Sequence, residues 1–228
     1  PSGGYLQLSG DITVPEPIYL NWQRNDYTGT PQLYALYNLS GSNTLAGEIT
    51  CYRTRIHLAG NTTLVFEGGV TNLDGFVVMD VPTGSSAIFR NKPVKSHTKT
   101  MYMSGYGQYI FRVPGNLWGQ TCIPSGGTVR PDVPDALPPT ATLNMLNAAG
   151  KLDLNGIDQT AAGILDSSKG TIQSATPAVL TINQSDNTTF AGRLNGAVGL
   201  LKTGSGTLTL SNSLSTTTGD ITVTDGTL

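Results

Sequence analysis

The stretch LLKTGSGTLTLSNSLSTTTGDITVTDGTL, residues 200–228, alternates apolar side chains with Thr or Ser and carries almost no charge. Leu208 and Leu210 fall on one side of an extended chain, and Thr207 and Thr209 fall on the other. A period of two is typical of a β-strand with one buried face. Because glycines bound each run, the stretch predicts short strands separated by tight turns.

Related units recur upstream. GGYLQLSGDITV (3–14) has the same order of strand, turn and strand, and MYMSGYGQYIFRVPGNLWGQTCIPSGGTV (101–129) is a degenerate copy of residues 200–228. GSNTLAGEI (41–49) matches SDNTTFAGRL (185–194). Serial repetition of a strand–turn unit of roughly 20–25 residues indicates a solenoid of stacked coils.

A parallel β-helix accounts for the composition. Leu, Ile and Val would fill its core, Thr and Ser would cover its outer surface, and Asn-Gly and Asp-Gly dipeptides would form its corners. The same dipeptides form two-residue hairpin turns, so an antiparallel sandwich is the structural alternative. The serial order of the repeats favours the solenoid over the sandwich.

Three phrases carry a family resemblance. LLKTGSGTLTLSN, GDITV and TDGTL follow one another in residues 200–228, and DALPPTATLNMLNAAGKLDLNGIDQTAAGI occupies residues 135–164. NLSGSNTLAGEI (38–49) is followed by LAGNTT (58–63). In these phrases the chain resembles the autotransporter-associated β-strand repeat proteins, which are large bacterial surface or secreted proteins with passenger-like β-helices.

The resemblance covers residues 37–70 and 101–228 and is weak over 15–36 and 71–100. It implies a right-handed, single-stranded parallel β-helix exported from a Gram-negative-type bacterium. It implies no chemistry, because an active site does not define the family. We therefore expect an all-β solenoid over residues 1–228, less regular at 15–36 and with an irregular excursion near 71–100.

Composition excludes several classes of protein. Only 12% of residues are charged and the formal net charge is -2, which argues against nucleic-acid binding through clustered Lys and Arg. The sequence contains no run of 18 apolar residues, so it predicts no membrane span in this segment. The repeat phrases run up to both ends, from Pro1 to Leu228. We therefore expect either part of a larger chain or copies that stack end to end into a fibre.

Candidate catalytic residues are sparse. Asp74 and Asp80 flank an apolar run, and stacking of coils could bring them near Glu67. Most other carboxylates occupy turn positions, and no Ser-His-Asp set, metal-ligand spacing or calcium loop is present. We therefore expect no enzyme activity, no cofactor and no metal site.

The segment CYRTRIHLAG predicts a basic strip. Alternation would place Cys51, Arg53, Arg55 and His57 on one face of a strand, too polar for the core. The strip is either a solvated strand face or a contact for an anion or an acidic glycan.

Two further groups combine aromatic and basic side chains. Because Tyr, Trp and Arg are favoured at interfaces, both groups are candidates for contacts with surface glycans or proteins, and core packing is the alternative. The first group includes Lys92, Lys95, Lys99, Tyr102, Tyr106 and Trp118, and the second consists of Tyr19, Trp22, Tyr27, Tyr34 and Tyr37.

The two cysteines, Cys51 and Cys122, allow one disulfide. A regular stack would hold residues 71 positions apart about three coils, or about 14 Å, from each other. A disulfide requires Cα atoms within about 7 Å. The bond would therefore form only if the excursion at 71–100 left fewer stacked coils between the two cysteines.

These observations predict an exported structural or adhesive scaffold at the cell surface or outside the cell. Assembly into a fibre is one option for it, and it is expected to have no catalytic activity. The alternative is a module of the same fold that binds or degrades a polysaccharide. A cleft that gathers Asp74, Asp80 and either Arg53 or Arg55 would favour that alternative.

Overall fold

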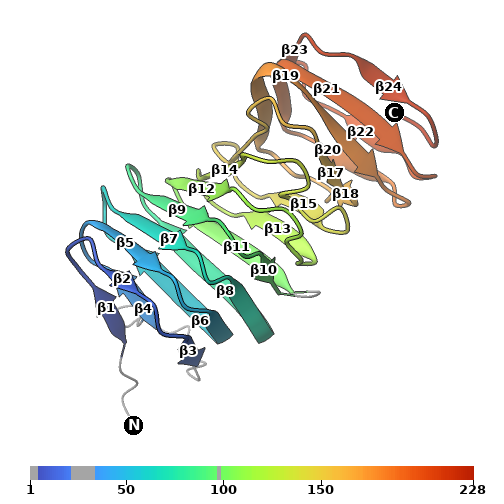
Figure 1. The fold of residues 1–228 in the computed structure, drawn as a ribbon. Helices are drawn as coiled ribbons and strands as arrows, with labels where there is room; N and C mark the ends of the chain where they lie inside the picture. The colour runs from blue at the N-terminus through green and yellow to red at the C-terminus, as the bar shows by residue number, and fades with distance from the viewer. Residues whose placement is uncertain (1–4, 22–33, 97–98) are drawn as a thin grey trace.

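The computed structural model describes residues 5–21, 34–96 and 99–228, apart from the side chains of residues 74–76. Within these ranges the chain is all β and forms a parallel β-solenoid of about nine turns. Figure 1 shows the coils stacked in chain order, with the two termini at opposite ends of the stack. Every strand pair in the described part is parallel, so the predicted β-helix is confirmed and the antiparallel sandwich is excluded.

The strands of the solenoid form three hydrogen-bonded sheets. The first sheet contains ten strands: β1 (Leu6–Leu8), β3 (Ile18–Asn21), β4 (Leu36–Asn38), β6 (Ile49–Leu58), β8 (Val70–Val81), β10 (Val94–Lys95), β11 (Thr100–Gly105), β13 (Gln120–Ile123), β15 (Thr142–Met145) and β18 (Gly163–Ile164). The second sheet contains twelve: β2 (Thr13–Val14), β5 (Ser42–Leu45), β7 (Thr63–Phe66), β9 (Ser86–Phe89), β12 (Gln108–Phe111), β14 (Thr128–Pro131), β16 (Lys151–Asp153), β17 (Gln159–Ala161), β19 (Thr171–Asn183), β21 (Arg193–Thr203), β23 (Thr216–Thr217) and β24 (Ile221–Val223). The third consists of β20 (Thr188–Phe190) and β22 (Leu208–Leu210).

Long strands bend so that one strand serves two walls. The first half of β6 pairs with β3, and its second half pairs with β4. In the same way β19 pairs first with β16 and then with β17. Paired residues of neighbouring coils lie 20 to 24 positions apart from Leu36 onward, as Leu36 with Ile56 and Val77 with Met101. This spacing is the repeat that the sequence predicted.

The described residues of the region 71–100, namely 71–96 and 99–100, stay within the stack, which differs from the predicted excursion. Strand β8 pairs with both β6 and β11, and β9 pairs with both β7 and β12. The irregularity is confined to two register shifts in the pairing of β6 with β8, around Tyr52. Because β8 gains residues there relative to β6, the extra length bulges within the wall rather than leaving it.

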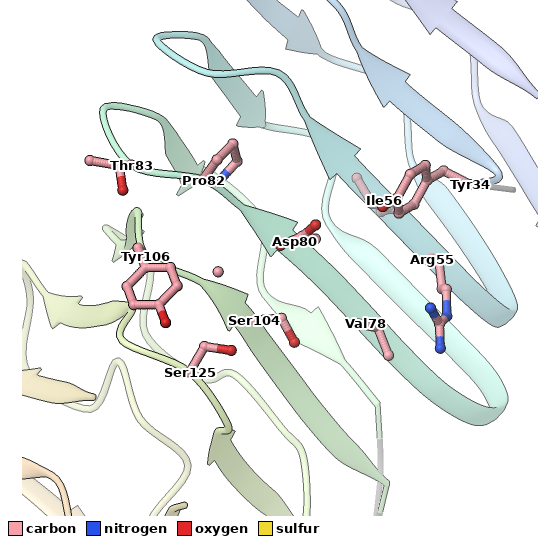
Figure 2. A pocket seen from close by; sticks show the side chains of 11 residues that line it. Tyr34, Arg55, Ile56, Val78, Asp80, Pro82, Thr83, Ser104, Tyr106 and Ser125 are labelled. Carbon is pink, nitrogen blue, oxygen red and sulfur yellow. The ribbon is translucent and has the colours of Figure 1, made fainter. Parts of the chain in front are cut away.

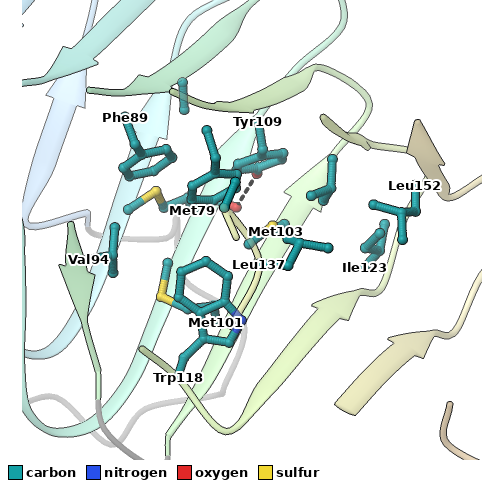
Figure 3. Packing of buried hydrophobic residues seen from close by; sticks show 14 of the residues in the cluster. Met79, Phe89, Val94, Met101, Met103, Tyr109, Trp118, Ile123, Leu137 and Leu152 are labelled. Atoms are coloured by element: carbon teal, nitrogen blue, oxygen red, sulfur yellow. Dashed lines mark hydrogen bonds between the residues drawn. The ribbon is translucent and has the colours of Figure 1, made fainter. Parts of the chain in front are cut away.

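The interior is a continuous apolar column. The rings of Phe66, Phe89 and Phe111 stack in neighbouring coils with centroid distances of 4.8 and 4.6 Å, and Trp118 packs at a tilt against Phe111 at 5.3 Å. All four side chains are buried, and Figure 3 shows Phe89 and Trp118 among the methionine and leucine side chains of this region. Burying a Phe side chain stabilises a fold by about 1.5–3 kcal/mol, so the ladder contributes strongly to the stack.

Buried amide side chains satisfy backbone groups at the corners. Asn116 donates from Nδ2 to the carbonyls of Val113 and Ala136 and accepts at Oδ1 from the amide of Val94, at 2.7–2.9 Å. Gln159 accepts from the amide of Leu137 at 2.9 Å, in a similar role. Since an unpaired buried polar group is costly, these side chains allow the chain to turn inside a closed core.

Two glycines mark a corner where coils approach closely. A Cβ added to Gly68 would collide with the carbonyl of Gly47 in the coil below, and a Cβ on Gly47 would collide with the carbonyl of Glu16. Among the described residues, no helix has the length and apolar character to cross a membrane.

Candidate ligand-binding groove

The outer side of the first sheet carries a ladder of polar and aromatic side chains. Tyr37 pairs with His57, His57 with Asp80, and Asp80 with Ser104 across four adjacent strands. The Nδ1 atom of His57 lies 2.9 Å from Oδ2 of Asp80, and the ring of Tyr34 stacks on His57 at 4.4 Å between centroids. The ladder therefore joins a carboxylate, an imidazole and two phenol rings on one surface.

A bend in β6 decides which side chains of CYRTRIHLAG join this ladder. Arg53 has a φ of 47°, in the left-handed region, and it marks the corner between two walls. Alternation restarts after it, so Arg55 and His57 face outward as predicted, whereas Cys51 points into the core and is fully buried. The prediction that Cys51 shares the outer face with Arg55 is wrong, because a period of two does not continue through a corner.

A hollow of about 460 Å³ lies beside the ladder. Figure 2 shows Tyr106 at one end and Tyr34 at the other, with Asp80 between them. Its lining consists of Tyr34, Arg55, Ile56, Val78, Asp80, Pro82, Thr83, Ser104, Gly105, Tyr106 and Ser125. The volume falls within the range of roughly 300–1,000 Å³ that is typical of small-ligand sites.

Tyr106 is held over the next coil by a glycine. Its side chain is 61% exposed, and a Cβ on Gly126 would collide with the Cδ1 and Cε1 atoms of its ring. The ring therefore lies against the backbone of Gly126, which fixes its position while leaving most of its surface in solvent.

The charges in the hollow are mixed. Burial, and then the nearby carboxylate of Asp80, raise the pKa of the Tyr34 phenol, while the guanidinium of Arg55 acts in the opposite direction. Arg55 and Asp80 both line the hollow, so positive and negative charge stand close to the same space. Tyr34 thus remains a neutral hydroxyl donor and acceptor over the physiological pH range.

The predicted carboxylate cluster does not form from the side chains that the structure describes. Glu67 follows β7 and pairs with Arg90, which follows β9, with Oε1 and Nη2 2.5 Å apart. Asp80 lies in the hollow on the first sheet and is the one carboxylate in its lining. The side chain of Asp74 lies outside the described atoms. A glycosidase needs two carboxyl groups about 5–10 Å apart, and the lining of the hollow does not supply them.

The two aromatic and basic groups separate in the structure. Lys92 and Lys95 are exposed on and beside β10, away from the hollow, and Lys99 is half-buried. Tyr102 is half-buried on the outer side of β11, and Tyr106 is the member that lines the hollow.

Trp118 is a core residue, so its prediction as a binding residue is wrong. It is fully buried, and its Nε1 donates to Oγ1 of Thr121 at 2.8 Å. Trp22 and Tyr27 lie outside the described residues.

The disulfide that the sequence allowed between the two cysteines is not formed. Cys51 and Cys122 are free thiols, and both are buried. Cys51 pairs with Asn72 in β8, whereas Cys122 pairs with Tyr102 in β11, so the two lie in different coils and the intervening coils remain in the stack. The bond depended on an excursion that the described residues 71–96 and 99–100 do not make.

Sequence reasoning missed several groups in the hollow. Ser104 lies near the end of β11 and Ser125 lies in a turn, whereas Tyr34 was already a candidate as a member of the N-terminal aromatic group. To place these residues in one hollow, the sequence would have had to reveal which residues of neighbouring coils pair, at separations of 20 to 24 positions. In the described ranges, no three His, Cys, Asp or Glu side chains gather to form a metal site.

A second hollow, of about 490 Å³, lies on the outer side of β19, β21 and β24. Its lining is mostly small or aliphatic, and it has no aromatic side chain.

Comparison of the chain with family models, curated proteins and solved structures finds no match.

Proposed function

We propose that this protein is an exported structural or adhesive scaffold of a Gram-negative-type bacterium, at the cell surface or in the extracellular space, and that it is not an enzyme. The observation that carries the proposal is the uninterrupted stack of parallel coils around one apolar column. Each coil rests on its neighbours alone, which is the construction of a rod rather than of a globule around a reaction centre.

The outer surface supports the same role. Few side chains are charged, and several of the charged ones pair between adjacent coils, such as Arg90 with Glu67 and Arg112 with Asp132. These pairs, together with Thr and Ser on the strands, leave a surface of low charge that has little nonspecific attraction for polyions. Its partners are further copies stacked end to end, the rest of a longer chain, or surface glycans.

Location and shape test the proposal directly. An antibody against the purified chain is expected to label intact cells of the source bacterium, and electron micrographs of the native material should show rods or filaments. Labelling that appears only after lysis, together with compact particles in the micrographs, would contradict an exported scaffold.

The second candidate is a polysaccharide-binding module of the same fold. The hollow between Tyr34 and Tyr106 favours binding, because it combines aromatic rings with hydroxyl, carboxylate and guanidinium groups. Degradation has less support, since Asp80 is the sole carboxylate in the described lining.

A further inference from the structure

The hollow on the first sheet has an aromatic ring near each end. Tyr34 precedes β4 and stacks on His57 of β6, and Tyr106 follows the end of β11, so that β6 and β8 lie between the strands of the two tyrosines. Adjacent strands are about 4.8 Å apart, so three strand spacings, or about 14 Å along the solenoid axis, separate the coils that carry the two tyrosines. A ligand that touches both must be elongated and must lie across the strands.

The space between the rings is polar but not of one charge. Asp80 accepts hydrogen bonds, Arg55 donates them, and the hydroxyls of Ser104 and Ser125 do both. Because Arg55 and Asp80 carry opposite charges, a polyanion meets a carboxylate in this space and a polycation meets a guanidinium. The lining therefore matches a neutral ligand rich in hydroxyl groups rather than the acidic glycan that the basic strip alone suggested.

An extended peptide fits this surface poorly. Peptides that add to sheets use the free N–H and C=O groups of an edge strand. The hollow lies on the outer face of β6, β8 and β11, where these strands are paired with neighbours within the stack. Contacts here must come from side chains, and tyrosine rings are large amphipathic surfaces that suit the C–H face of a sugar ring.

We propose that this hollow binds a neutral oligosaccharide that lies along the solenoid axis, with sugar rings packed against Tyr106 and against the stacked pair of Tyr34 and His57. The inference gives the ligand class for the adhesive role and rests on that proposed function only for its biological use. Binding itself is a property of the isolated chain and is measured without reference to export.

Titration calorimetry with the full chain tests the site. The probes are neutral tetrasaccharides of glucose, xylose, mannose or galactose, with tetragalacturonate as the charged comparison. At least one neutral probe is expected to bind with a Kd below about 1 mM, more tightly than tetragalacturonate. Tyr106→Ala should weaken that binding by about tenfold or more, while Tyr106→Phe, which keeps the ring, should retain it.

Tyr19→Ala is the matched control, because Tyr19 is 59% exposed on β3 and does not line the hollow. It should leave the affinity unchanged, and thermal unfolding should show that all variants are folded. Absence of binding by every neutral probe, tighter binding of tetragalacturonate, or equal losses in Tyr106→Ala and Tyr19→Ala would overturn the proposal. Surface labelling of intact cells would be unaffected by any of these results, so the failure of the glycan site is distinguishable from failure of the scaffold role.

Discussion

Lys202 is, among the described residues, the one charged side chain that is fully buried. It occupies an inward position of β21, where Ile182 and Val223 are its neighbours in the adjacent coils. Its Nζ donates to the carbonyls of Thr203 and Gly204 at 2.7 and 2.6 Å. The ammonium thus provides hydrogen bonds to carbonyl groups at the corner where β21 ends.

Replacing Lys202 with Met should lower the free energy of unfolding by about 1.5–3 kcal/mol, because the corner carbonyls lose a charged donor. Urea denaturation of both proteins measures the difference. Lys151→Met, at an exposed position of β16, should stay within about 0.5 kcal/mol of the wild type. Equal stability of wild type and Lys202→Met would show that these carbonyls do not depend on the ammonium.

The buried thiols give a pH dependence with a defined sign. Burial raises the pKa of Cys51 to about 12 and that of Cys122 to about 11, from an ordinary value of 9.0. Below pH 9 both states hold the thiol protons and the thiols do not alter stability. Above pH 9 the unfolded chain loses them first, so stability falls as pH rises toward 11 and 12.

The fall should be about 1.4 kcal/mol per thiol for each pH unit above 9. Denaturant unfolding of the wild type and of the Cys51→Ala, Cys122→Ala double variant over this range measures it. The double variant should lack this part of the pH dependence. Identical slopes for the two proteins would show that the thiols ionise equally in the folded and unfolded states.

At the scale of the element, corner glycines limit what each coil can accept. Gly68 touches the carbonyl of Gly47 in the coil below, whereas a Cβ on Gly60 would meet nothing within 4 Å. Neither glycine has a positive φ, so the pair isolates the effect of crowding from that of backbone strain.

Gly68→Ala should therefore destabilise the fold by about 1–3 kcal/mol, because the neighbouring coil must shift to admit the methyl group. Gly60→Ala should be neutral or slightly stabilising, since it only restricts the unfolded chain. Thermal melts of both variants provide the comparison. Equal melting temperatures for the two variants would contradict close contact between coils at Gly68.

The elements also show what could be predicted from the sequence. Alternation in GTLTLSN and the serial repeats predicted parallel stacked strands, because both patterns are local. The bend at Arg53 was not predictable, since an arginine with a φ of 47° gives no signal in the sequence. Trp118 was predicted as a contact residue for a similar reason. Whether its ring points into the core depends on how the backbone turns at the preceding corner, and the sequence does not show that turn. A cleft with Asp80 and Arg55 was foreseen as one possibility, but Ser104 and Ser125 were missed because the residues of the hollow come from separate coils.

At the scale of the whole molecule, the coils contact only their neighbours, so the effect of a core mutation should remain local. Ile172 is fully buried and pairs with Leu152 and Leu194 in the coils on either side. Ile172→Ala is expected to cost about 2–5 kcal/mol at that point in the stack.

Hydrogen exchange should then speed up in β16, β19 and β21 and stay nearly unchanged in β5 and β7, near the other end of the stack. Mass spectrometry of peptide fragments resolves these regions. A uniform acceleration along the chain would instead describe a single cooperative unit that opens as a whole.

The spacing of 20 to 24 residues between paired positions determines what duplication of a coding segment would do to the protein. Copying a stretch of DNA that encodes one such unit would lengthen the protein by about 4.8 Å and leave the packing of distant coils as it was. Such a duplication would change the length of the solenoid without compensating substitutions elsewhere.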